Sequence, residues 1–229
     1  MEPLRDARYE LKMVVPEVLL PFVRAQLYLH PDGIRKTYPP RIVSNVYFDD
    51  NEFSRFRESV EGISERRKVR LRWYGEGSSA TRLALEIKIR RAQLGWKIVH
   101  PVSVSIDFAS SVRWTDIVST IRGSVSLDGR HEMALTPNPV LVNRYRREYF
   151  ATADGDIRIT LDSDQFAFSQ LISPYPNFRI QIPHERNLVI ELKAPHGRVE
   201  RLREVATSLP YAVIRNSQYV VACRAAFEL

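Results

Sequence analysis

Charged and apolar side chains alternate most strictly in the stretch Lys68-Val69-Arg70-Leu71-Arg72-Trp73-Tyr74. Because successive side chains of a β-strand point to opposite faces, this stretch predicts a strand with one cationic face and one apolar face. Lys68, Arg70 and Arg72 share the cationic face. Taken alone, such a face is typical of a solvated sheet edge, since like charges on one face repel unless water or an anion compensates them.

The same division recurs in five further segments, at 8–13, 84–90, 145–150, 156–162 and 189–193. In one open antiparallel sheet, the charged face would meet bulk water, where Thr, Ser and Gln suit strands better than Arg, Lys and Glu. A barrel with the charged face inward would instead line a water-filled lumen, and about eight strands enclose a space of small-ligand width. Extended stretches at 41–48 and 98–106 bring the number of strands near eight. We therefore expect an α+β fold, an antiparallel eight-stranded barrel with helices packed outside.

Helical spacing of apolar residues predicts the helices that cover this barrel. They are expected at 16–30, 51–60, 108–122 and 199–209. Pro21 is compatible with the first of them only if the helix begins close to it, within one turn. The segment 124–136 is expected to be a loop.

Composition limits the classes of function. The chain has 229 residues, and we expect one domain over residues 1–229. A net charge of +7 favours polyanionic partners. No helix-turn-helix, zinc-finger or RNP-like motif is present, so nucleic acid is not the expected partner.

The same sequence also bears on cellular location. It contains no run of apolar residues long enough to span a membrane, and residues 1–6 form no signal-peptide core, so a cytoplasmic location is expected. Cys223 is the only cysteine, which excludes an internal disulfide, and its apolar neighbours predict a buried, inert thiol.

A lumen lined by arginine and lysine is suited to an anion. Guanidinium groups pair with phosphate oxygens through two parallel hydrogen bonds. The interspersed glutamates suit a divalent cation held beside that anion.

Taken in order, the motifs resemble those of a known family. They are Tyr-Glu-Leu-Lys at 9–12, Lys-Val-Arg-Leu-Arg at 68–72, Leu-Glu-Ile-Lys at 85–88, Tyr-x-Arg from 145 leading into Ile-Arg-Ile-Thr-Leu-Asp at 157–162, and Ile-Glu-Leu-Lys at 190–193. This order resembles the VTC domain, the polyphosphate polymerase domain of the vacuolar transporter chaperone complex, in its bacterial stand-alone form. That domain belongs to the triphosphate tunnel metalloenzyme, or CYTH-like, superfamily. The resemblance runs from about Arg8 to Tyr219.

The resemblance implies a tunnel barrel that transfers the γ-phosphoryl group of ATP to a growing inorganic polyphosphate chain. By resemblance, the catalytic, phosphate-holding residues are Lys12, Arg70, Arg72, Lys88, Arg147, Arg158 and Lys193, of which Arg70, Arg72, Lys88 and Arg158 bind the ATP phosphates. Glu191 corresponds to the family's metal ligand, with Glu10 and Glu86 beside it, and the metal would be Mn²⁺ or Mg²⁺. A membrane-protein partner that removes the product is also implied.

Two departures from the family pattern keep other functions open. Ser217-Gln218-Tyr219 has a neutral amide where the family has lysine, and Lys97 stands alone where a basic pair is usual. Both reduce the hold on a long anion. The alternatives are a hydrolase of inorganic triphosphate or nucleoside triphosphates, and a non-catalytic polyphosphate-binding module. Glu86 with Lys88, or Glu191 with Lys193, could also be ion pairs of purely structural value.

Overall fold

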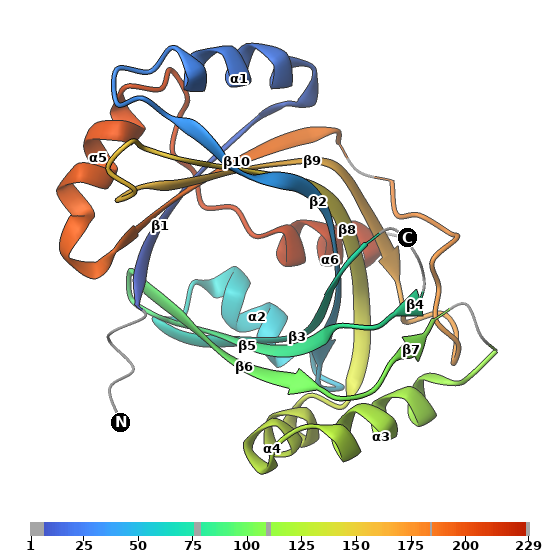
Figure 1. Cartoon of the computed structure of the whole chain (residues 1–229). Helices are drawn as coiled ribbons and strands as arrows, with labels where there is room; N and C mark the ends of the chain where they lie inside the picture. The colour runs from blue at the N-terminus through green and yellow to red at the C-terminus, as the bar shows by residue number, and fades with distance from the viewer. Residues whose placement is uncertain (1–6, 76–78, 109–110, 184, 228–229) are drawn as a thin grey trace.

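Eight antiparallel strands close into a barrel in the computed structural model, which describes residues 7–75, 79–108, 111–183 and 185–227. Figure 1 looks along this barrel. Around the ring the strands are β1 (Arg8–Pro16), β10 (Asn187–Pro195), β9 (Arg158–Ser169), β8 (Asn138–Ala151), β2 (Arg35–Asp49), β3 (Glu65–Tyr74), β5 (Leu83–Arg91) and β6 (Leu94–Val102). The expected α+β barrel is confirmed.

The ring closes through a short contact between β1 and β6. Their paired residues are Arg8 with Gly95 and Tyr9 with Leu94. Beyond this contact, β1 pairs with a segment from near the end of the sequence. The backbone amide of Ile214 in that segment donates a hydrogen bond to the Lys12 carbonyl at 2.8 Å. This segment leads directly into α6 (Gln218–Phe227) and brings the end of the chain to the barrel.

The apolar faces of the strands point outward and are covered by helices. Trp73 is 1 % exposed, and its ring stacks on Phe108 with centroids 4.7 Å apart. The core on this side includes residues of α3 (Trp114–Ser124) and α4 (Leu127–Leu135). Nearby, β4 (Ser79–Ala80) pairs with β7 (Ile106–Asp107).

The opposite wall, made by β1, β9 and β10, packs against α1 (Leu20–Tyr28) and α5 (Val199–Thr207). One-turn 3-10 helices precede both, η1 (Glu17–Leu19) and η2 (His196–Arg198). Pro21 lies in the first turn of α1, where its missing N–H removes no helical hydrogen bond. None of the helices in the described ranges is long and apolar enough to cross a membrane.

Two of the helix expectations need correction. The segment 124–136 is not a loop, because α4 occupies most of it and Ser126 caps that helix by accepting a hydrogen bond from the Gly129 amide. The expected helix 108–122 begins only at Trp114, and residues 109–110 of that range lie outside the described part of the chain.

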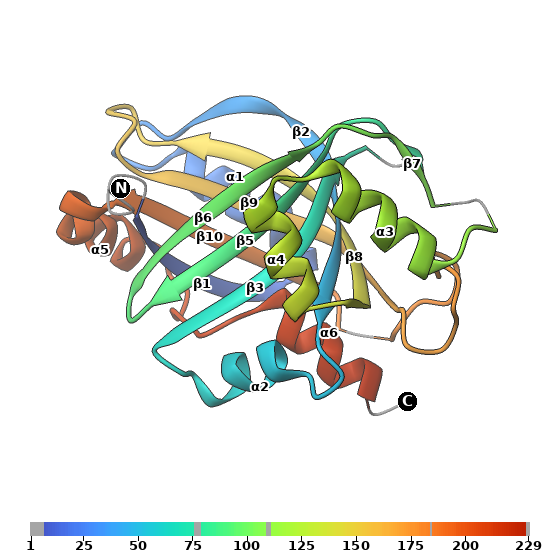
Figure 2. The same ribbon diagram turned by 90° about the horizontal axis from the view of Figure 1, so that it is seen from below.

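One end of the barrel is closed by α6, a helix that the pattern of apolar residues did not predict. Figure 2 shows α6 beside α2 (Ser54–Glu61) at one end of the strands. The ring of Tyr219 stacks on that of Tyr47 in β2, with centroids 4.8 Å apart, and Cys223 is buried in the same cluster. Burial raises the pKa of the Cys223 thiol to about 12, as expected for an inert thiol.

Asp49 connects α2 and α6 to the barrel. Its carboxylate accepts hydrogen bonds from the amides of Arg55 and Phe56 at 3.0 Å and from the Tyr219 hydroxyl at 2.6 Å. Asp49 is fully buried. We therefore expect Asp49→Ala to lower the free energy of unfolding by about 3 kcal/mol in urea denaturation, because the buried Tyr219 hydroxyl and two partly buried helix amides lose their acceptor. The matched control is Asp50→Ala, whose carboxylate caps the same helix at its more exposed start; it should cost about 1 kcal/mol. Equal costs would contradict this account of Asp49.

Candidate functional site

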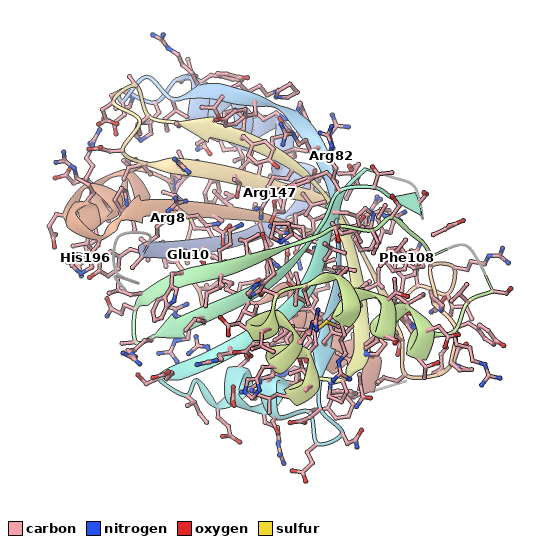
Figure 3. All side chains as sticks on the ribbon, turned by 60° about the horizontal axis from the view of Figure 1, so that its bottom comes forward. Arg8, Glu10, Arg82, Phe108, Arg147 and His196 are labelled. Atoms are coloured by element: carbon pink, nitrogen blue, oxygen red, sulfur yellow. The ribbon has the colours of Figure 1, made fainter. Side chains whose placement is uncertain are left out.

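The inward faces of the strands bring the predicted site residues together. Seven cations and three carboxylates were predicted, and they come from six strands of the ring, β1, β3, β5, β8, β9 and β10. In Figure 3 the labelled Glu10 and Arg147 lie between the strands, away from the covering helices. Most of these charged side chains contact one another, in two groups.

The first group surrounds Glu86. Arg70 donates through Nε and Nη2 to Glu86 Oε2 at 2.9 and 2.6 Å, and Lys97 Nζ donates to Oε1 at 2.6 Å. Burial opposes ionisation of Glu86, but the positive charges of Arg70 and Arg72 outweigh it and hold the pKa of Glu86 well below its usual value. Glu86 is thus a buried carboxylate with three cationic neighbours.

Arg72 is held by neutral groups that the sequence reasoning missed. Its Nε donates to Asn45 Oδ1 at 2.7 Å and its Nη2 to the Tyr145 hydroxyl at 3.0 Å, while Asn45 donates in turn to Asn143. These groups fix the plane of the guanidinium. Strand parity could have found Asn45, Asn143 and Tyr145, because each lies on the lumen face of its strand.

The second group surrounds Glu191. Lys193 Nζ lies 2.8 Å from Oε2, Lys12 Nζ lies 3.3 Å from Oε1, and Arg147 Nη2 lies 3.6 Å from Oε2. Burial alone would raise the pKa of Glu191, yet these cations, Lys193 first, hold it well below the usual value. Glu191 therefore stays ionised in the lumen.

Glu10 extends this second group towards β5. Lys88 Nζ donates to Glu10 Oε2 at 2.9 Å, and Lys193 Nζ lies 3.7 Å from Oε1. Burial opposes the charge on Glu10, but Lys88 and Lys193 lower its pKa to about 2. Lys193 consequently bridges Glu10 and Glu191. Lys88 bonds to Glu10, so the structural pair of Glu86 with Lys88 is not what the structure shows.

Asp162 also faces the lumen, although it was not among the predicted residues. Arg147 donates to its two carboxylate oxygens through Nε and Nη2, at 2.6 and 2.7 Å. Gln218 Nε2 donates to Asp162 Oδ2 at 3.1 Å. Gln218 therefore lies in the site, and the parity of Asp162 with Arg158 was the signal available in the sequence.

Lys68 faces the lumen without an ion-pair partner among the carboxylates of the described residues. Its Nζ donates to Ser217 Oγ at 2.7 Å and lies 5.7 Å from the centre of the Tyr219 ring, and no carboxylate of the described residues forms an ion pair with it. Burial, together with the charges of Lys88 and Lys12, lowers its pKa well below the usual value. An anion in the lumen would relieve this repulsion.

Arg158 lies apart from the two groups. It is exposed at the start of β9, where its backbone pairs with Lys193 of β10. Within the described ranges its side chain makes no ion pair. The structure thus places Arg158 at the rim of the barrel.

The three predicted metal ligands do not form one cluster. Glu10 and Glu191 share Lys193, whereas Glu86 is engaged by other cations. The described residues contain no group of three or more His, Cys, Asp or Glu side chains placed to hold a metal ion. Two neighbouring carboxylates do fit Mg²⁺ or Mn²⁺ when phosphate oxygens and water complete the coordination, which is the usual way Mg²⁺ is bound.

Lys88 leads to a prediction about pH. Burial lowers its pKa to about 8 even though Glu10 favours the charged form. Below pH 8 the lysine is cationic and attracts an anion; above pH 8 its charge is lost unless anion binding is coupled to the uptake of a proton. We expect the affinity for inorganic tripolyphosphate, measured by calorimetry, to fall by up to about tenfold per pH unit above 8. Lys88→Arg, which stays charged, should flatten this profile, and an identical profile in both proteins would contradict the assignment.

Comparisons with known proteins agree with this geometry. The profile of the VTC domain family matches residues 7–227. A putative adenylyl cyclase, HpAC1 from Hippeastrum, described as having a dominant triphosphatase activity, superposes with a TM-score of 0.53 at 14% identity, over 96% of this chain and 95% of that one. The PH1819 protein from Pyrococcus horikoshii OT3 superposes with a TM-score of 0.50 at 14% identity, over 93% of this chain and 96% of that one. At such identities these two likenesses show a shared fold. No curated protein matches the sequence significantly. The match across nearly the whole chain, joined to a closed barrel with a charged lumen, shows that the chain belongs to the VTC domain family.

Proposed function

We propose that the protein is a metal-dependent polyphosphate polymerase that transfers the γ-phosphoryl group of ATP to a growing polyphosphate chain inside the lumen. The observation that carries this proposal is the excess of cations over carboxylates among the described lumen residues, with Lys68 lacking any carboxylate. A buried excess of positive charge is costly unless an anion compensates it. A chain of phosphates supplies such charge along the whole lumen.

The cations have different parts in this proposal. Arg70, Arg72 and Arg147 present guanidinium planes already fixed by hydrogen bonds, which suits them to phosphate oxygens in a defined orientation. Lysine side chains act as movable point charges, and in this site they are those of Lys12, Lys88 and Lys193. Arg158, exposed at the rim, would capture phosphate first.

Phosphoryl transfer requires little covalent chemistry from the protein. Its transition state spreads charge over the phosphoryl oxygens, so catalysis consists mainly of positioning and neutralisation. The barrel would hold the donor phosphate and the end of the acceptor chain in line, which replaces a bimolecular encounter by an oriented one. No nucleophilic side chain is needed.

Glu191 and Glu10 would hold the metal, Mn²⁺ or Mg²⁺. The bound ion would neutralise phosphate charge. Lys193 and Lys88 contact these two carboxylates in the structure. Their ammonium groups could turn to phosphate oxygens, since each ends a flexible side chain.

A triphosphate hydrolase is the second candidate. Gln218 favours it, because this neutral side chain bonds to Asp162 where the family has a lysine, so one charge that would hold a long chain is missing. The Hippeastrum protein of similar fold is described by a triphosphatase activity.

A non-catalytic polyphosphate-binding module is the third candidate. In each case we propose a cytoplasmic location, where ATP is available, and no nucleic-acid partner; the polymerase would also use a membrane-protein partner that removes product.

One incubation separates these functions. Purified protein is mixed with ATP and Mn²⁺, and polyphosphate is separated from free phosphate by electrophoresis. We expect chains longer than triphosphate, and none with Arg70→Ala, which loses a fixed guanidinium. Free phosphate alone would establish the hydrolase instead, and polyphosphate binding without turnover would establish the binding module.

Gln218→Lys tests the missing charge. A lysine at this position would compete with Arg147 for Asp162 and would add one positive charge to the lumen. We expect the affinity for long-chain polyphosphate to rise about five- to tenfold at low salt, measured by calorimetry. Gln218→Met, of similar length and uncharged, should show no rise, and no gain in the lysine variant would show that this position does not limit binding.

A further inference from the structure

An aromatic group lies on the rim of the barrel, at the end opposite α6. It consists of Tyr38, Arg41, Tyr74 and Tyr149, which we call the tyrosine rim, and it comes from the adjacent strands β2, β3 and β8. The Arg41 guanidinium lies 5.5 Å from the centre of the Tyr74 ring and 6.0 Å from that of Tyr149. Tyr38 meets Tyr149 edge to face at 5.9 Å. The group therefore has two rings at one cation and a third ring against one of them.

Strand register connects the tyrosine rim to the lumen. Tyr74 follows Arg72 by two residues, and Tyr149 follows Arg147 by two, so each ring lies on the same face as a phosphate-site arginine and about 7 Å farther along the strand. Arg41 is paired directly with Arg147 in the register of β2 and β8. A molecule whose phosphates contact Arg72 and Arg147 would extend its next group onto these rings.

The rim is left open to water. Tyr74 is 52% exposed and Tyr38 is 60% exposed. Arg41 is also exposed, and its side chain forms no ion pair with any carboxylate in the described ranges, so its contacts are with ring faces. Single exposed aromatic residues are ordinary, but two exposed rings and a partly buried third, gathered at a cation without an ion pair beside the proposed anion site, form a stacking surface. Figures 1 and 2 show that α6 and α2 lie at the other end of the strands and leave this one uncovered by them.

We propose that the tyrosine rim binds the base of a nucleoside triphosphate whose phosphates occupy the lumen. This inference rests on the proposed function, because it assigns the donor a nucleotide and not inorganic triphosphate. Bases stack on tyrosine rings and on the guanidinium plane through their π-faces. Every base has such a face, so the rim should favour nucleotides over inorganic triphosphate while discriminating weakly among adenine, guanine and pyrimidines.

The test compares two ligands on matched variants. Binding of a non-hydrolysable ATP analogue and of inorganic tripolyphosphate is measured by calorimetry with Mg²⁺, for the wild type, Tyr74→Ala and Tyr74→Phe. Stacking by one ring is worth roughly tenfold in affinity, so Tyr74→Ala should weaken the ATP analogue by about that factor and leave tripolyphosphate unchanged. Tyr74→Phe keeps the ring and should bind both ligands like the wild type.

A second variant, Tyr38→Ala, guards against a local effect of the first substitution and should show the same selective loss. An equal loss of affinity for both ligands, or no loss for either, would contradict base binding at the tyrosine rim while leaving the phosphate site intact. If the wild-type protein bound neither ligand, the proposed function itself would fail. The two failures are therefore distinguishable.

Discussion

Glu191→Gln is expected to reduce ATP-dependent turnover by about a hundredfold to a thousandfold at saturating substrate. The substitution removes the carboxylate that lies within 4 Å of Lys12, Arg147 and Lys193, and it removes one of the two proposed metal ligands. Because glutamine has nearly the same shape, the barrel should keep its closure. Steady-state kinetics over a range of Mn²⁺ concentrations measures the effect, and added metal should not restore the wild-type rate.

The control is a carboxylate on the outer surface of the barrel. Glu132 of α4 pairs with Arg67, whose side chain points away from the lumen, so Glu132→Gln should leave turnover unchanged. Wild-type activity in the Glu191 variant would remove Glu191 from the metal site. Equal losses in both variants would indicate an effect on folding.

Glu86→Gln should have the largest effect on stability. Glu86 is 3% exposed and compensates Arg70 and Arg72, so its loss leaves two buried guanidinium groups without a carboxylate. Breaking a buried ion pair from one side costs about 3 to 5 kcal/mol. We expect this decrease in the free energy of unfolding in urea, and we expect tripolyphosphate to restore more stability to the variant than to the wild type, because the anion takes the place of the carboxylate.

Glu65→Gln is the matched control, since Glu65 is half exposed and pairs with Arg91 on the surface. It should change the free energy of unfolding by less than about 1 kcal/mol. If Glu86→Gln were as mild, or if tripolyphosphate stabilised both proteins equally, the two arginines would not depend on a negative charge in the lumen.

The barrel could be predicted because its strands carry a two-residue period that a single sequence displays directly. Val69, Leu71 and Trp73 are each at most 1% exposed, while Arg70 and Arg72 face the lumen. The inward direction of the charged face followed from residue preference, because Thr, Ser and Gln suit a water-facing strand of an open sheet better than Arg, Lys and Glu. Among the described residues, closure depends on two residue pairs between β1 and β6, which no local pattern reveals.

The helices were predicted less well, for two physical reasons. α4 buries only Gly129 and Met133, too few residues to produce a clear helical period. α6 buries Tyr219, Ala222 and Cys223 on one face, but Val221 and Phe227 are apolar and exposed, so its apolar residues do not form the single stripe that marks a surface helix. Both helices are specified by tertiary contacts.

In the site, the charged residues of the strand motifs were found and the neutral partners were not. Asn45 and Tyr145 hold Arg72 by hydrogen bonds, which depend on which strands become neighbours. Asp162 closes a motif that was recognised, but its bidentate contact with Arg147 depends on the pairing of β8 with β9. A single sequence does not give that pairing.

The central claim is that the inward charges form one phosphate site, and a crystal structure with inorganic tripolyphosphate tests it most directly. We predict density for the anion inside the barrel, in contact with Arg70, Arg72 and Arg147, and with Lys68 no longer bonded to Ser217 alone. Tripolyphosphate bound only on the outer surface, with the ion pairs of Glu86 and Glu191 unchanged, would contradict the account.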